Sequence, residues 1–343
     1  GSSPAPASSA SSSGDKGQRA LNDATAGAVS GCVARFIVGP LDVLKIRFQV
    51  QTEPVSRRAA TATLSGGSLP KYTGIMQALG TIIREEGVVA LFRGMVPGQL
   101  LTIPYCAIQF VTAHQAKTFA KESGMLDSPF GPFVSYLSGA TAGVAATVGS
   151  YPFDLLRTTL AAQGEPRVYN NMFDAARAIV NQKGFGGLYC GLKPTLVEIV
   201  PYAALQFGLY DTLNKGMTNA RYRAMASMTW QKPPDRNNMP ANPAQQFLCG
   251  FLSGVCAKLG THPLDVAKKR YQIAGLARNA TYGASIDQSV TKSLLRCLYN
   301  IWKYEGLRGL YKGATPSLLK SAPQAAVTFS VYEMVLRKLQ KTS

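Results

Sequence analysis

The chain has 343 residues and carries 36 lysines and arginines against 18 aspartates and glutamates, which gives a net charge of +18 at pH 7. Its mean hydropathy of +0.02 is too low for a membrane bundle that is apolar throughout and high for a very basic soluble protein. A strongly basic chain commonly binds nucleic acid, anionic lipid or anionic small molecules. Here the cations are spread along the chain and form no stripe interleaved with aromatic residues, so nucleic acid is not expected as a partner.

The sequence contains no recognised motif for catalysis or metal binding. The six cysteines form no Cys-x-x-Cys pair, and His114 and His262 have no cysteine or histidine at the spacing of metal ligands. A P-loop, a nucleophile elbow and paired carboxylates are also absent from it. We therefore expect a protein that is not an enzyme and that holds neither a metal ion nor a cofactor.

The first 18 residues are rich in serine, alanine and proline, contain no apolar stretch, and are predicted to be disordered. Six apolar segments follow, at residues 24–43, 98–111, 133–156, 194–210, 244–266 and 316–331. Several approach the ~20 residues that span a bilayer. Amphipathic runs at 75–84 and 172–182 are predicted to be short helices at the membrane surface. The polar stretches 56–71, 215–242 and 277–289 are predicted loops.

The first, third and fifth apolar segments end in a motif that recurs at a nearly constant interval. Each copy begins with a proline and carries an aspartate two residues later and a lysine or arginine five residues later. Acid and base are three residues apart, so on a helix they share one face. Two glycines spaced four residues apart precede each proline, and this spacing favours close packing of membrane helices. The three copies are Pro40, Asp42, Lys45; Pro152, Asp154, Arg157; and Pro263, Asp265, Lys268.

A second motif also occurs three times, once before each even-numbered apolar segment. A glycine is followed five residues later by phenylalanine or tyrosine, two residues after that by a second glycine, and then by two prolines spaced seven apart. A long period with the same residue types indicates an internal repeat, so we expect one domain of three units instead of two soluble domains.

Together, the two motifs resemble the mitochondrial carrier family over about residues 21–340. The resemblance implies an all-α membrane protein with six transmembrane helices in three pseudo-symmetric repeats, each with a short matrix-side amphipathic helix. We expect a carrier domain at 19–340, with repeats at about 21–120, 131–220 and 243–340. The family further implies alternating access in the inner mitochondrial membrane by a protein that works as a monomer. Parallel repeats around an axis along the membrane normal are a known transporter architecture.

In this family the three proline-kinked helices converge on the matrix side, where the repeated acids and bases pair in a ring that closes a gate. Such charges are costly inside a membrane protein unless they are paired. Gln49 and Gln272 resemble the family's glutamine braces beneath this gate, whereas repeat two has Ala161 at that position. The pairs implied for this chain are Asp42 with Arg157, Asp154 with Lys268, and Asp265 with Lys45.

The opposite, cytosolic gate follows the family pattern poorly. That pattern is an aromatic residue, an acid, and a base three residues after the acid. Only Lys117 keeps the base, so we expect a weak cytosolic gate. The residues at the corresponding positions are His114, Lys117, Asp211 and Glu333.

The starts of the even-numbered segments resemble the family's cardiolipin-binding turns. Free backbone N–H groups at a helix start suit a lipid phosphate. The partner motif of these turns is degraded in repeats two and three. The residues expected to bind lipid are Gly74, Arg93, Gly94, Gly191, Lys312 and Gly313.

An asymmetric substrate requires positions where the repeats differ, and they differ at the family's mid-membrane contact points. Arg35, Lys258 and Lys320 suit a multiply charged phosphate compound. Glu198 suits a cationic or amino-bearing group on the same ligand, or else pairs with one of the three cations. The remaining candidates for substrate contact are Leu101, Thr102, Thr147, Ile199, Gln109 and Gln206, of which the two glutamines either read polar ring edges or join helices.

A zwitterionic diphosphate such as thiamine pyrophosphate fits these charges. Independently, residues 40–51, 153–170 and 198–212 resemble the thiamine pyrophosphate carriers of the family. We therefore expect thiamine pyrophosphate as a transported substrate. One alternative is a carrier of adenine nucleotides or coenzyme A, against which Glu198 argues because it would meet added negative charge. A second is an uncoupling-type proton channel, and a third is a soluble DNA-binding helical repeat, which the glycine pairs and apolar segments disfavour.

Overall fold

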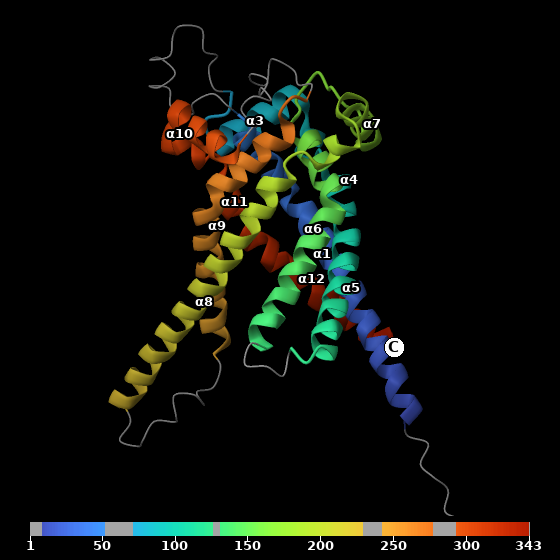
Figure 1. Cartoon of the computed structure of the whole chain (residues 1–343), viewed down its shortest axis with the longest axis vertical. Helices are drawn as coiled ribbons and strands as arrows, with labels where there is room; N and C mark the ends of the chain where they lie inside the picture. The colour runs from blue at the N-terminus through green and yellow to red at the C-terminus, as the bar shows by residue number, and fades with distance from the viewer. Residues whose placement is uncertain (1–8, 52–70, 126–130, 229–241, 277–292, 343) are drawn as a thin grey trace, which may run out of the picture.

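The computed structural model describes residues 9–51, 71–125, 131–228, 242–276 and 293–342, and within these ranges the chain forms only helices and the turns that join them (Figure 1). The helices, in chain order, are α1 (Ser9–Val50), α3 (Ile75–Glu86), the 3₁₀ helix η1 (Val88–Phe92), α4 (Met95–Leu100), α5 (Thr102–Glu122), α6 (Gly131–Ala162), α7 (Met172–Lys183), the 3₁₀ helix η2 (Phe185–Tyr189), α8 (Leu192–Met228), α9 (Pro243–Ile273), α10 (Leu294–Leu310), α11 (Ala314–Leu319) and α12 (Ser321–Thr342).

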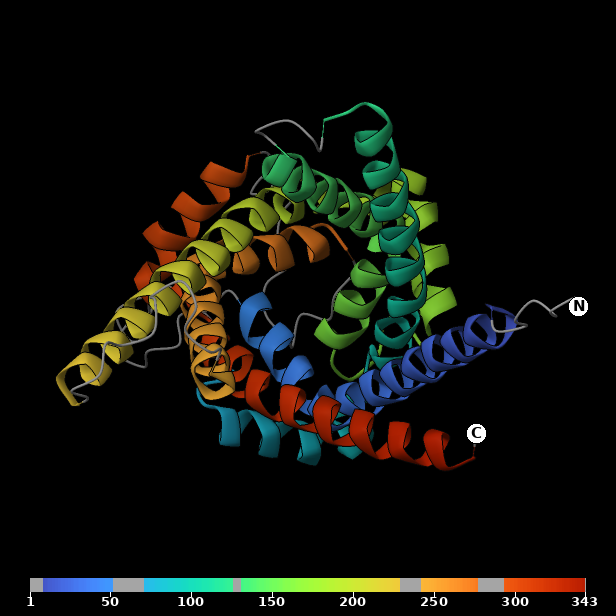
Figure 2. The same ribbon diagram turned by 90° about the horizontal axis from the view of Figure 1, so that it is seen from below.

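The long helices are arranged in a ring around a central axis (Figure 2). α5 packs along α6, α8 along α9, and α12 along α1, so the last repeat closes against the first. The helices converge at the end that carries α3, α7 and α10 and spread apart at the other end (Figure 1). We call these the closed end and the open end. The expected threefold arrangement of helix pairs is therefore present.

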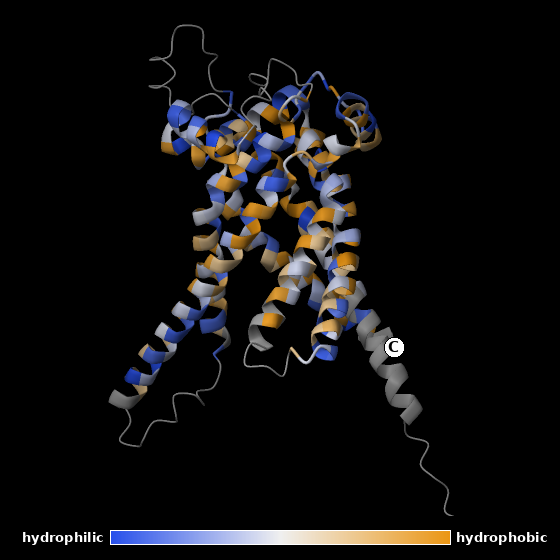
Figure 3. Ribbon diagram, viewed as in Figure 1, coloured by the Kyte–Doolittle hydropathy of each residue, from blue (hydrophilic) through white to orange (hydrophobic). Residues whose placement is uncertain are grey.

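Polar and apolar residues are interleaved along most of the ring helices (Figure 3). By length and composition, one described helix has a clear membrane span, at Thr25–Val50, and the bent pair Ile75–Glu86 with Val88–Glu122 would add a second. The other long helices contain many glycine, serine, threonine and charged residues, and α6 has no charge before Asp154 yet is rich in glycine, serine and threonine. Length and composition alone therefore do not reveal the six spans that the three repeats contribute.

A proline inside each of α1, α6 and α9 steers the helix toward the ring axis. Pro40, Pro152 and Pro263 lie within continuous helices. Proline removes one backbone donor and clashes with the preceding turn, which bends the helix. The turns after the prolines meet in an apolar cluster that seals the closed end. Its members are Val43, Ile46, Val50, Ala161, Ala162, Ile273 and Ala274.

The short helices α3, α7 and α10 lie across the closed end, one per repeat (Figure 1). Each buries one apolar face against the end of the kinked helix of its own repeat, as Ile82, Ile179 and Ile301 do in three separate clusters. Two of these helices are the amphipathic runs predicted from the sequence, and α10 supplies the third.

Three expectations about local structure are corrected. Residues 9–18 begin α1 instead of being disordered, because extending an existing helix needs no new nucleation; residues 1–8 lie outside the described part. Residues 215–228 continue α8, because they contain no proline and many good helix formers. The glycine pairs are not at a close contact: a Cβ at Gly27, Gly139 or Gly250 would meet nothing within 4 Å, since these positions lie toward the spread end of the ring.

Candidate functional site

Three ion pairs between neighbouring repeats lie at the closed end, just beyond the proline kinks. Lys45 Nζ is 2.8 Å from Asp265 Oδ2, and Lys268 Nζ is 3.3 Å from Asp154 Oδ2. Arg157 pairs with Asp42. We call these three pairs the latch. Every pairing predicted from the sequence is formed, and the ring they make joins α1, α6 and α9 across the axis.

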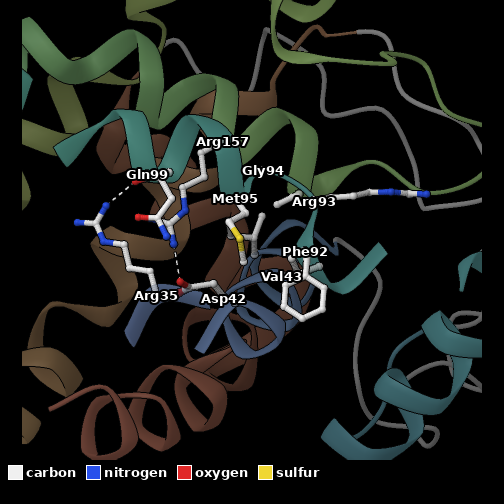
Figure 4. A pocket seen from close by; sticks show the side chains of 13 residues that line it. Arg35, Asp42, Val43, Phe92, Arg93, Gly94, Met95, Gln99 and Arg157 are labelled. Atoms are coloured by element: carbon white, nitrogen blue, oxygen red, sulfur yellow. Dashed lines mark hydrogen bonds and ion pairs between the residues drawn. The ribbon is translucent and has the colours of Figure 1, made fainter. Parts of the chain in front are cut away.

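Arg157 reaches Asp42 through a space that a glycine leaves open. A Cβ at Gly98 would lie 3.2 Å from both Cδ and Nε of Arg157. The corresponding residues of repeats two and three are Thr195 and Ser317, and the latch bases that correspond to Arg157 in the other two pairs are the slimmer lysines Lys268 and Lys45. A small cavity of about 20 Å³ remains beside this pair (Figure 4).

Each latch carboxylate also has a second cation, and two of these cations were predicted as substrate residues. Lys320 Nζ is 2.6 Å from Asp42 Oδ1, and Lys258 Nζ is 2.8 Å from Asp265 Oδ2. The third is Lys269, whose ammonium is 3.6 Å from Asp154 Oδ1. Sequence reasoning missed Lys269, because repeat one has Ile46 and repeat two Thr158 at that position.

Glu198 lies 3.5 Å from Lys258, so the alternative in which it pairs with one of the cations describes the structure. Arg35 of α1 donates to the carbonyl oxygen of Gly98 in α4 (Figure 4). Lys320 stands at the break between α11 and α12, and Leu101 at the matching break between α4 and α5. The breaks come just before prolines that lack an N–H donor.

The other predicted substrate residues have less distinctive surroundings. Thr147 donates to Gly143 O of its own helix at 2.7 Å. The hydroxyl of Thr102 is buried without a hydrogen-bond partner among the described residues. The half-buried side chains in this group are Leu101, Ile199, Gln109 and Gln206.

Only one of the two expected glutamine braces is made. Gln272 Nε2 donates to Asp154 Oδ2 at 2.9 Å and lies near the hydroxyl of Tyr151. Gln49 is fully buried, yet its amide has no hydrogen-bond partner in the described part of the chain. By the symmetry of the ring Gln49 would brace Asp265, but that carboxylate already holds Lys45 and Lys258.

Buried arginines join the repeats beyond the latch, a role that the sequence did not reveal. Arg47 forms a two-pronged pair with Glu86 and donates to the carbonyl oxygens of Ala161 and Gln163 at the end of α6. Arg270 does the same with Glu305 and with the end of α1. The dipeptide Glu-Gly recurs at 86–87 and 305–306, and this recurrence could have pointed to the two glutamates as partners of the arginines.

Repeat two reverses this arrangement. Thr159 replaces the arginine and Lys183 replaces the glutamate. Lys183 Nζ instead donates to Ala274 O at the end of α9, at 2.6 Å. Beyond the latch, a single cation therefore links repeat two to repeat three, whereas a bidentate arginine–glutamate pair lies at each of the other two interfaces.

The two cations among the residues expected to bind lipid have acidic partners within the protein. Arg93 and Lys312 are both nearly buried: Arg93 pairs with Glu86 and Glu165, and Lys312 pairs with Glu305. Both cations therefore have carboxylate partners within the protein, and Arg93 also lines the groove beside Gly94. Hydrogen bonding from Arg167, together with Arg93, lowers the pKa of Glu165, which keeps this link ionised.

The glycine turn at Gly94 borders a groove. Gly94 and Gly313 adopt left-handed conformations directly before α4 and α11, and Gly191 does so before α8. A cavity of about 290 Å³ lies between the start of α4 and the start of α7. The start of α3 at Gly74 has no side-chain cap, but Asn171 caps α7 by accepting from Asp174 N. Fewer free backbone N–H groups therefore remain at the start of α7, in repeat two, to bind a phosphate.

The predicted cytosolic gate lies at the open end and forms no ring in the described structure. His114, Lys117 and Asp211 are exposed, and Glu333 pairs only within α12, with Arg337 at 3.3 Å. Closure at one end and separation at the other is the arrangement expected of one state of an alternating-access transporter.

Comparison with known proteins agrees with this arrangement. The family model described as "Mitochondrial carrier protein" matches residues 16–124, 128–221 and 240–343, one match per repeat. The chain belongs to this family of membrane carriers.

Its relatives include mitochondrial thiamine diphosphate carrier 1 of Arabidopsis thaliana, 49% identical over 92% of this chain and 93% of the relative. Mitochondrial thiamine diphosphate carrier 2 of Zea mays is 50% identical over 93% and 94%. The mitochondrial thiamine pyrophosphate carrier of Bos taurus is 38% identical over 91% and 90%.

Proposed function

We propose that this protein exchanges thiamine pyrophosphate across the inner mitochondrial membrane by alternating access. The observation that carries the proposal is the charge gathered inside the ring, where Arg35, Lys258 and Lys320 are accompanied by Glu198. A diphosphate matches the cations, and a thiazolium or aminopyrimidine matches the carboxylate. The names of the relatives support the same substrate.

In this proposal the closed end faces the matrix and the latch is the matrix gate. Gln272 steadies it from the matrix side. The separated residues His114, Lys117, Asp211 and Glu333 form the cytosolic gate when the carrier turns over. The grooves at the glycine turns take the phosphates of an anionic lipid such as cardiolipin, through backbone N–H groups.

The test is uptake of labelled thiamine pyrophosphate into liposomes that contain the purified protein, preloaded with thiamine pyrophosphate, thiamine monophosphate, ADP or coenzyme A. We expect strong exchange that falls in both Lys320→Ala and Glu198→Ala. Uptake of ADP or coenzyme A without thiamine pyrophosphate would assign the carrier to those substrates. Proton leak without substrate exchange would indicate an uncoupling-type channel.

A further inference from the structure

A cavity of about 20 Å³ lies beside the Asp42–Arg157 pair of the latch (Figure 4). Three of the residues that line it, Gly39, Gly98 and Ala161, are small. Each occupies a position at which the other two repeats carry a longer polar side chain. In the same order, the residues at these positions are Tyr151 and His262, Thr195 and Ser317, and Gln272 and Gln49. Three polar positions of the latch are therefore truncated together around one ion pair.

At Asp154 the longer side chains form a connected network. Gln272 Nε2 donates to Asp154 Oδ2 at 2.9 Å and lies 3.3 Å from the hydroxyl of Tyr151. That hydroxyl donates to the carbonyl oxygen of Cys190 at 2.9 Å. The carboxylate is thus braced by protein groups. At Asp42 the same positions carry nothing larger than the methyl group of an alanine, so this network cannot form there.

The groups that line the cavity have hydrogen-bonding capacity to spare. Arg157 carries five N–H donors, yet within the described part of the chain Nη2 is the only one of its nitrogens that donates a hydrogen bond, to Asp42. The carboxylate of Asp42 has about four acceptor sites, and it accepts from Arg157 and Lys320. A buried water needs roughly 10–15 Å³ and about two to four polar partners. The cavity meets both requirements.

We propose that this cavity holds one ordered water, which bridges Asp42 and Arg157 in place of the glutamine amide that braces Asp154. In surroundings of low polarity, polar groups without partners are costly, and a water that joins them removes this cost. One pair of the latch is therefore braced by solvent and another by protein. The inference goes beyond the proposed function, because it holds whichever substrate is carried.

Two substitutions of similar size distinguish a wet cavity from a dry one. Ala161→Gln and Ala161→Met both displace the water, but only the glutamine amide can replace its hydrogen bonds. We expect the Tm of Ala161→Met to lie about 3 °C below that of Ala161→Gln, the shift that corresponds to roughly one or two lost hydrogen bonds. A dry cavity predicts the reverse, because methionine would fill apolar space. The measurement is thermal unfolding of the purified full-length protein without substrate.

Ala162 provides the matched control. It is the next residue of α6, is buried in the apolar cluster, and does not line the cavity. Ala162→Met should therefore have a higher Tm than Ala162→Gln. A higher Tm for glutamine at position 161 alone supports the proposal. Equal Tm values in the Ala161 pair, or the same order at both positions, would overturn it.

A direct measurement does not depend on how the variants fold. A density map of the unmodified protein, at a resolution that shows ordered waters, should contain a peak in the cavity within hydrogen-bonding distance of Asp42 and Arg157. A cavity without such a peak would overturn the proposal even if the Tm values follow the expected order. Neither experiment contains a substrate, so an incorrect substrate assignment leaves both outcomes unchanged.

Discussion

Gly98 is the residue that permits an arginine in a ring otherwise built with lysines. The wider guanidinium of Arg157 needs room that Thr195 and Ser317 do not leave at the matching positions of their repeats. Because Cδ and Nε of Arg157 would lie only 3.2 Å from a Cβ at this position, even alanine would crowd the path. The ring departs from threefold symmetry here because the larger base, Arg157, occurs together with the smallest residue, Gly98.

Gly98→Ala should displace the guanidinium of Arg157 and lower stability by about 1–3 kcal/mol, the usual cost of overpacking. Arg157→Lys in the same chain should restore much of the loss, because lysine lacks the bulky group. The measurement is the Tm of the purified protein, with Gly139→Ala as control, since a Cβ there meets nothing within 4 Å. An unchanged Tm in Gly98→Ala would show that the side chain has space to move.

At the scale of helices, the surface helices act as connectors between repeats. α3 and α10 carry Glu86 and Glu305, which fix Arg47 and Arg270 against the ends of the next kinked helices. α7 ends in Lys183, which makes this contact directly. The link that the surface helices make between repeats two and three therefore has the fewest charged contacts, although Lys268 and Lys269 join the same two repeats closer to the latch.

Arg47→Ala should cost about 3–5 kcal/mol, because it removes a buried partner of Glu86 and leaves two carbonyl oxygens without their donor. Lys183→Ala removes one charged hydrogen bond and should cost only ~1.5 kcal/mol. Chemical or thermal unfolding of each variant measures the difference. The exposed Arg177 of α7 provides the control, and Arg177→Ala should have almost no effect. Equal losses of stability in Arg47→Ala and Lys183→Ala would contradict the expected difference between these two contacts.

Over the whole molecule, the two ends of the ring are unequal. The closed end has three ion pairs, three second cations and an apolar cluster beneath them. The predicted gate at the open end retains a single base in the expected place, Lys117. The proposed transport cycle therefore contains one strong gate and one weak gate.

Lys117→Ala should reduce the exchange rate by less than about fivefold, since an exposed ion pair contributes at most ~1 kcal/mol. Lys121→Ala, one turn further along α5, is the control and should transport normally. Lys268→Ala should be far more damaging, because it leaves the buried Asp154 with Lys269 as its remaining cation. Complete loss of exchange in Lys117→Ala would refute the weak cytosolic gate.

The repeat, the family and the residues of the latch can be read from the amino-acid sequence alone. Three copies of one spacing place three acids and three bases at equivalent depth, and the family's cyclic arrangement assigns each acid one base. Helix existence was equally readable, because periodic apolar segments and prolines are local signals. The ends of α1 and α8 were missed because polar residues continue an established helix at little cost.

Which charges share a partner is settled by the folding of the chain into a ring. Lys258 and Lys320 were assigned to the substrate from their depth, yet in the folded chain they also hold Asp265 and Asp42. Arg93 and Lys312 were assigned to lipid and turn instead toward glutamates of the surface helices. A sequence gives the position of a charge along its helix. The direction and reach of a long side chain depend on neighbours from other repeats, and these are set only when the ring closes.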